Sequence, residues 1–505
     1  MLGTYDPAFL LTRLNLRVER DPDKNEFLNT SILYSSTTVH ERMHWNQFAG
    51  TIWGNWCMFI YQSRYNLFFS PGNELIVKEI IKSHKEFKPN SDYSFDRDLY
   101  NKFPETQCLL YNDWLSHTIT YGLFQNGGDR YSNVGEVREH VATSMAFTYF
   151  TVNNFLELGE TGRILDYEKS LNFDDFGLIR PEGFNTISVK NLLEGQARAS
   201  ELLHFITMSS QFQTKQKEKE ALFSAILNYS DTYWGSFFFY LDVCGLKAAD
   251  IFRKEEKLTA EITKFCILVD IALNPPLVPF YPIEELKHTK WIEIFPPATF
   301  FKACVALAKK PKNLDVFNQE EILSFYHHIC SALGRPTPFE LAHSFMSTNQ
   351  NKISQINREW EHTPFSYSGK EFYHYLFYVI NKFCEVRQKY PIYISNYGLA
   401  SIGEYSSRYT DILFDFNGKH EYVRSSPLQL DMNKSQSLLT PIVNNNPNER
   451  FFWLTIILLS NYIMNQLIMG NKISRDTFPF NIPDHVKKSL KSSVQMNFGI
   501  SFDWE

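Results

Sequence analysis

The sequence predicts a protein of the α+β class that is mainly α-helical, with a small N-terminal β-hairpin or sheet and large helical additions. The hairpin is suggested by "FLLTRLNLRVERDPDKNEFLNTSILYSS", residues 9–36, in which two β-prone segments flank the turn-rich "DPDKN". A helix should follow, because residues 38–65 contain no proline and place apolar side chains at helical spacing. A second strong helical pattern covers residues 188–208.

The rest of the chain reads as further helices, a strand-like "YPIYIS" at 390–395 and an apolar helix at 451–469. Helical patterns also occur at 73–87 and 137–158. The charged "TKQKEKE" at 214–220 is the expected main boundary between domains. The expected domains are a metal-binding domain with a helical insertion at 66–187, a helical domain and a mixed α/β region, at 1–213, 214–385 and 386–505 respectively.

The composition is that of a folded globular protein and disfavours several partners. Hydrophobic residues make up 44% and charged residues 21% of 505. A net charge of -6 without a long basic run gives no reason to expect nucleic acid or an anionic membrane as partner. Seven scattered cysteines without CxxC, and no signal-like start, favour a reducing, cytoplasmic location. Polar residues such as Ser460 and Asn461 interrupt the apolar helix, which favours burial over membrane insertion.

The stretch "VHERMHW" carries the first candidate site. His40 and His44 are four residues apart, so both imidazoles lie on one face of a helix, and Gln47 and Thr51 extend that face. Glu41 lies a quarter-turn away. In an HExxH motif the two histidines bind zinc, and the glutamate reaches a water beside the metal.

An ordinary structural interpretation of the same stretch is also open. Thr38-x-x-Glu41 has the form of a capping box, in which Glu41 would only satisfy backbone donors where a helix begins. The two histidines would then have no common ligand.

A catalytic zinc needs a third protein ligand, and "LLEGQARASELLHF" offers one. Glu194 and Glu201 are seven residues apart and share a helix face, while Gly195 and Ala197 leave the flank slim enough for close packing. The structural alternative is a surface helix with an Arg198–Glu194 ion pair.

Together the two segments resemble the gluzincin metallopeptidases, especially the aminopeptidase N type, with its HExxHxW helix and a glutamate in an EGxAxxxE setting. The resemblance implies a zincin-like core, zinc bound by His40, His44 and Glu194, Glu41 as general base, and Glu201 supporting the ligands. Gln47, on the same helix face as the histidines, is a second candidate for such support. The resemblance covers about ten residues in each segment. The chain differs in having 149 residues between His44 and Glu194 and in lacking a GAMEN-like segment.

The resemblance implies a peptide or protein substrate, and two other functions stay open. One is a non-catalytic helical interaction protein that retains the core. The other is a di-iron carboxylate protein, because Glu41-x-x-His44 and Glu201-x-x-His204 are two ExxH motifs. Further candidate site residues are Glu139 as a reserve ligand, Glu136 with it as a di-iron ligand, and Tyr121, His140 and His204 as groups that could stabilise a transition state.

Overall fold

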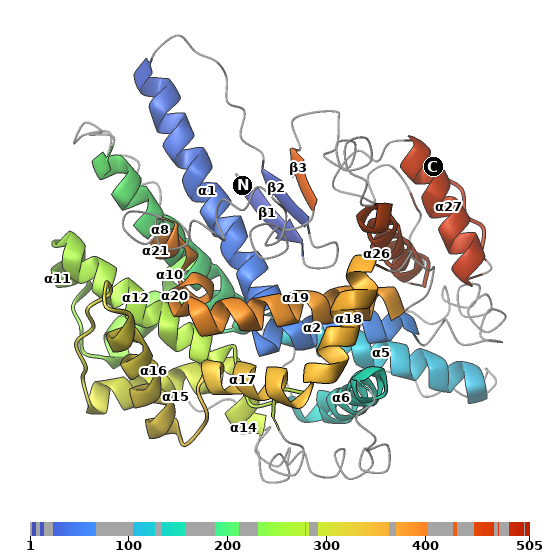
Figure 1. The fold of residues 1–505 in the computed structure, drawn as a ribbon, viewed down its shortest axis with the longest axis horizontal. Helices are drawn as coiled ribbons and strands as arrows, with labels where there is room; N and C mark the ends of the chain where they lie inside the picture. Colours follow the sequence, from blue (N-terminus) through green and yellow to red (C-terminus); the bar gives the residue numbers. More distant parts are fainter. Residues whose placement is uncertain are drawn as a thin grey trace.

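The computed structural model shows a mainly helical protein (Figure 1), so the predicted α+β class is wrong. Packed helices, and not the expected zincin-like α+β core, make up most of the described chain. The structure describes residues 3–6, 11–14, 24–66, 105–126, 134–156, 187–211, 231–277, 279–281, 291–362, 370–401, 428–431, 449–468, 473, 484–498 and 500–504. The predicted helix at 73–87 and the predicted boundary at 214–220 lie outside these residues.

The described helices follow one another along the chain from Lys24 to Phe498. They are α1 Lys24–Gly50, α2 Ile52–Asn66, α5 Glu105–Asn126, α6 Val134–Leu156, α8 Val189–Gln211, α10 Asp231–Val243, α11 Ala248–Phe252, α12 Glu255–Ala272, α14 Trp291–Ile294, α15 Pro296–Lys309, α16 Gln319–Leu333, α17 Pro338–Thr348, α18 Gln350–His362, α19 Lys370–Lys389, α20 Pro391–Ser395, α21 Tyr397–Ala400, α26 Glu449–Ile468 and α27 Asp484–Phe498.

Strands take up little of the described chain. β1 Gly3–Asp6 pairs antiparallel with β2 Leu11–Leu14, which pairs in parallel with β3 Leu428–Asp431. The second arm of the hairpin predicted around "DPDKN" is instead the first half of α1, which begins at Lys24. Strand propensity depends strongly on tertiary context, and a 27-residue helix packed along the core is the context that prevails in this fold.

The strand predicted at 390–395 is also wrong, because Pro391–Ser395 forms the short helix α20. Proline is well tolerated at the first position of a helix, where its missing N–H would have no intrahelical partner. All five residues are buried, so the apolar character of this segment reflects burial rather than a strand.

One hydrophobic core joins residues from all three expected domains. The cluster includes Trp45 and Trp56 of the N-terminal segment, Phe265 of α12, and Ile463 of α26. The domain division itself stays a prediction. Within the described residues no helix is both long and apolar enough to cross a membrane, and α26 contributes buried residues to the core.

The helix predicted from residue 38 to about 65 is bent at Thr51, where α1 ends and α2 begins. The first N–H groups of α2 find partners outside their own helix: Ile52 donates to Asn274 Oδ1 at 3.2 Å, and Trp53 donates to the Leu273 carbonyl at 2.9 Å. A Cβ on Gly54 would lie 2.2 Å from the Gln47 carbonyl oxygen, so the bend requires glycine there.

A buried ion pair fixes the end of α1. Arg387 of α19 donates to both carboxylate oxygens of Asp270, at 2.7 and 2.9 Å, and also to the Gly50 carbonyl at 2.9 Å. Tyr326 of α16 donates to the same Asp270 carboxylate at 2.7 Å. The network therefore ties α12, α16 and α19 to the C-terminal end of the helix that carries the HExxH motif.

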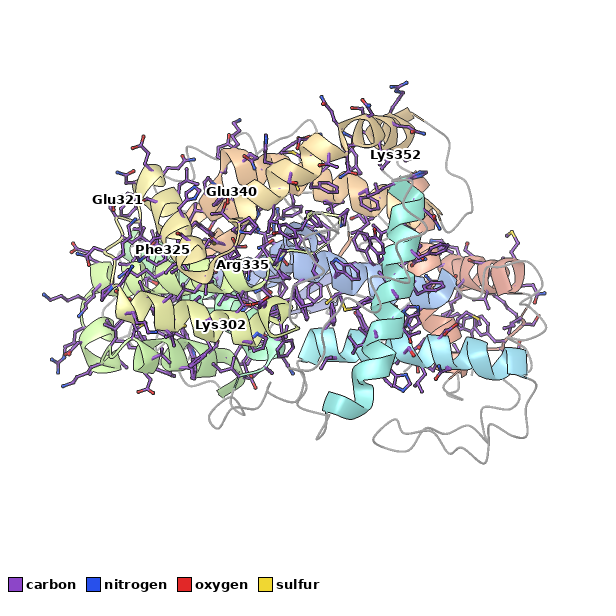
Figure 2. All side chains as sticks on the ribbon, turned by 90° about the horizontal axis from the view of Figure 1, so that it is seen from below. Lys302, Glu321, Phe325, Arg335, Glu340 and Lys352 are labelled. Atoms are coloured by element: carbon purple, nitrogen blue, oxygen red, sulfur yellow. The ribbon has the colours of Figure 1, made fainter. Side chains whose placement is uncertain are left out.

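A second arginine, in the turn after α16, binds the C-terminal end of α12. Arg335, in the turn that follows α16, donates to the carbonyls of Ile271 and Asn274. Figure 2 labels Arg335 and also Phe325 of α16, which is fully buried. A cation at the carbonyl end of a helix satisfies acceptors that have no partner within the helix.

Replacement of Asp270 by asparagine should destabilise the whole fold, because it leaves the Arg387 charge buried without its carboxylate. We expect the free energy of unfolding in urea to fall by about 3–5 kcal/mol. The control is Glu385→Gln in the more exposed Lys382–Glu385 pair, where a change of at most about 1 kcal/mol is expected. Equal effects of the two substitutions would contradict this role for the buried pair.

Candidate metal centre

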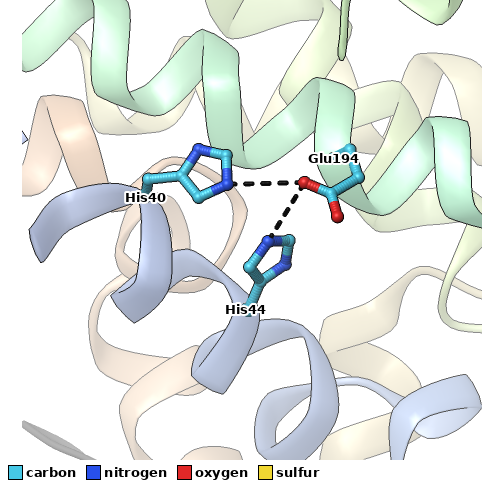
Figure 3. A group of neighbouring side chains, drawn as sticks. All are labelled: His40, His44 and Glu194. Carbon is cyan, nitrogen blue, oxygen red and sulfur yellow. Dashed lines mark ion pairs between the residues drawn. The ribbon is translucent and has the colours of Figure 1, made fainter. Parts of the chain in front are cut away.

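Helices α1 and α8 bring together the three side chains that the sequence singled out as metal ligands (Figure 3). His40 and His44 stand on adjacent turns of α1, and Glu194 stands on α8. Glu194 Oε2 lies 3.4 Å from His40 Nε2 and 3.4 Å from His44 Nε2. A single carboxylate oxygen therefore faces two imidazole nitrogens across the helix interface.

These distances suit ligands of one ion. Donor atoms about 2.0–2.1 Å from a common tetrahedral centre are about 3.3–3.4 Å apart. A direct charge-assisted hydrogen bond between imidazole and carboxylate would be shorter, about 2.7–2.9 Å. The donor set of two imidazoles and one carboxylate is also a zinc set that leaves a fourth position open. The residues present thus fit a catalytic zinc ion.

The cluster is buried but reachable from one side. The two histidine residues are 7% and 8% exposed, whereas the Glu194 side chain retains 21% of its surface. Within the part of the chain that the structure describes, this is the one group of three or more His, Cys, Asp or Glu side chains able to share an ion. Glu194 therefore marks the side on which the cluster meets the solvent.

His44 is oriented by Gln47, as the shared helix face predicted. Gln47 Oε1 lies 2.8 Å from His44 Nδ1, and because an amide oxygen only accepts, Nδ1 carries the hydrogen. The Gln47 amide nitrogen donates to the Leu193 carbonyl at 2.8 Å and to Gln196 Oε1 at 2.9 Å. This chain of hydrogen bonds fixes the amide and leaves His44 Nε2 facing Glu194.

His40 is oriented by Glu201, which lies seven residues after Glu194 on the same face of α8. Glu201 Oε2 lies 3.1 Å from His40 Nδ1, in a buried ion-pair contact. Burial opposes a charge on His40, but the carboxylates of Glu194 and Glu201 outweigh it and raise its pKa to about 10. Burial opposes ionisation of both carboxyl groups, yet His44 and His40 lower the pKa of Glu194, and His40 and Arg198 lower the pKa of Glu201.

Glu41 is not a helix cap, which rules out the capping-box interpretation. It lies in the interior of α1, which begins at Lys24, and its Oε2 atom is buried without a hydrogen-bond partner among the described residues. Burial raises the pKa of its carboxyl group to about 7, although His40 and His44 pull it down. A buried carboxylate beside the ligands, with no structural partner for that oxygen, is available for proton transfer.

The other candidate side chains do not join the cluster. His204 lies between Ser35 Oγ at 2.6 Å and Ser401 Oγ at 3.0 Å, and burial lowers its pKa to about 4. The Tyr121 ring lies near that of Tyr61, and His140 Nδ1 contacts Ser116 Oγ at 2.9 Å. The side chains of Glu136 and Glu139 lie outside the described residues.

Three residues near the centre were missed or misassigned from the sequence. Gln196 bridges α8 to the carbonyls of Cys266 and Ser395, at 3.1 and 2.9 Å. Tyr233 of α10 places its ring centroid 6.0 Å from that of His40. Arg198 is buried and pairs with Glu201, not with Glu194 on a surface helix as the structural alternative supposed. No sequence motif marks a glutamine, a tyrosine or an arginine at these three positions.

Comparisons of the chain with protein-family models, curated proteins and solved structures find no match. The resemblance to gluzincins therefore rests on the two motifs and on the contacts between them.

Metal content tests the assignment of ligands. Protein purified and dialysed against Zn²⁺ should hold about one ion per chain, and His44→Asn or Glu194→Ala should lose it, because two remaining ligands hold zinc weakly. His204→Asn, a buried histidine of α8 outside the cluster, is the control and should keep the ion. Full retention of zinc by Glu194→Ala would show that the cluster is not the binding site.

Proposed function

We propose that this protein is a zinc-dependent hydrolase of peptide bonds, with Glu41 as general base. The proposal is carried by one observation: residues with 149 others between them in the chain meet at 3.4 Å as a His–His–Glu donor set. The environment of Glu41 supports a hydrolytic role, because one buried oxygen of its carboxylate, beside the donors, has no hydrogen-bond partner among the described residues.

The residues of the chain divide the chemistry between them. His40, His44 and Glu194 would hold zinc, which supplies a Lewis acid that polarises the scissile carbonyl and acidifies a water. Glu41 would accept the proton of the attacking water and return it to the leaving amine. A pKa near 7 suits both transfers, since the group is then readily ionised and readily protonated at neutral pH.

The donor set alone does not choose the metal. Two histidines and one carboxylate also bind Fe(II) in non-haem oxygenases. The additional carboxylate of Glu41 favours zinc and hydrolysis, because a water-activating base is required there. Metal analysis separates these cases: one zinc supports the hydrolase, one iron an oxygenase, and two irons the di-iron alternative. His204, held by two serines, is poorly placed to serve the last of these.

A non-catalytic helical interaction protein is the remaining alternative. It predicts folded protein that cleaves no peptide, with or without bound metal.

For the hydrolase we propose a peptide or protein substrate and a cytoplasmic location, and neither nucleic acid nor a membrane as partner.

Substitution of Glu41 by glutamine tests the proposed base. The change keeps the size of the side chain and all three metal ligands, so fold and zinc content should be unchanged. Cleavage of a quenched fluorescent peptide library should fall by about 10²–10⁴-fold, the range expected when a general base is removed.

Glu340→Gln is the matched control. Glu340 forms a capping box with Thr337 at the start of α17, where glutamine serves nearly as well. Its activity should equal that of the wild type. Undiminished cleavage by Glu41→Gln would remove Glu41 from the mechanism, and zinc-loaded wild type without any cleavage would favour the interaction protein.

A further inference from the structure

We propose that Arg198 is a positioning residue that holds His40 in its metal-binding orientation through Glu201, and so sets how tightly the centre binds its metal. The inference rests on the proposed metal centre. A guanidinium has five N–H donors and no lone pair to offer a metal, so Arg198 can act on the ion only through its neighbours.

The first argument is a shared oxygen. Arg198 donates from Nη1 to Glu201 Oε2, and the same oxygen lies 3.1 Å from His40 Nδ1. The Arg198 and Glu201 side chains are only 8% and 3% exposed, so this contact is shielded from water and salt. Glu201 therefore cannot swing away from His40 without breaking a buried pair with Arg198.

The second argument is a common aromatic neighbour. The Arg198 guanidinium lies 5.6 Å from the centroid of the Tyr233 ring, and that ring lies 6.0 Å from the His40 ring. Tyr233 thus contacts both ends of the chain Arg198–Glu201–His40. Arg198, Glu201 and Tyr233 thus surround one side of the His40 imidazole, and its Nε2 atom faces Glu194.

Helices α8 and α10, which carry Arg198 and Tyr233, pack closely against each other. A Cβ on Gly195 would lie 2.2 Å from Ser236 Oγ, so α10 approaches α8 more closely than any other residue would allow. Ser236 Oγ also donates to the Asn191 carbonyl at 2.8 Å. Tyr233 is on the same helix as Ser236, three residues earlier, and is brought to Arg198 by this contact.

The third argument is the burial of the Glu201 carboxylate. A carboxylate buried without a partner is strongly unfavourable. The Glu201 side chain is 3% exposed, and Arg198 donates to the oxygen that faces His40. Arg198 therefore stabilises Glu201 in the position from which it contacts the imidazole.

Arg198→Gln tests the proposal, with Zn²⁺ affinity measured by competition with a chelator and geometry by the visible spectrum of the Co²⁺-substituted protein. We expect binding weaker by about 10- to 100-fold, as for other groups that orient a metal-bound histidine, and an altered Co²⁺ spectrum. The control is Arg253→Gln, which removes an arginine from an exposed pair of the same spacing with Asp250 and should change neither.

The route through Glu201 is tested in the Glu201→Gln background, where Arg198→Gln should weaken metal binding no further. An additional loss there, or unchanged affinity and spectrum in the single variant, would overturn the proposal. If circular dichroism shows that Arg198→Gln is unfolded, Arg198→Lys decides. Lysine keeps the charge but not the planar donor group, so weaker binding and a changed spectrum are expected, and wild-type values would overturn the inference. Wild type that binds no metal refutes the proposed function instead.

Discussion

The close packing of α1 against α8 is the constraint on which the centre depends. It brings the Glu194 carboxylate to both imidazoles of α1. On another side of α8, Gly195 allows α10 to approach closely. Gln196 then ties α8 to α12 and α20, and Arg387 holds the end of α1 from α19. Helices from distant parts of the chain thus fix the relative position of two short motifs.

The polar groups in this interface are arranged for a ligand rather than for packing alone. Burial of so many ionisable side chains is costly unless each finds a partner. His44 has Gln47, His40 has Glu201, and Glu201 has Arg198. Beside them, one buried oxygen of Glu41 has no hydrogen-bond partner in the described chain. A base that exchanges protons with a water needs an oxygen that can reach that water.

The site could be inferred from the sequence to the extent that helical periodicity governs it. Spacing of four placed His40 and His44 on one face, and spacing of seven placed Glu194 and Glu201 on another. Their meeting across 149 residues followed from chemistry and resemblance, not from periodicity. Tyr233 was missed because it arrives through tertiary packing of α10. The wrong strands have a common cause: β-prone residues at 25–36 and 390–395 are also compatible with helices, and the packed context selected helices.

The most direct test of the account is the position of the metal itself. Crystals of the zinc-loaded protein, measured on both sides of the zinc absorption edge, should show one anomalous peak. We expect it about 2.0–2.2 Å from His40 Nε2, His44 Nε2 and a Glu194 carboxylate oxygen, with the fourth position open towards Glu41. A peak elsewhere, or no peak between α1 and α8 while both helices keep their packing, would contradict the central claim.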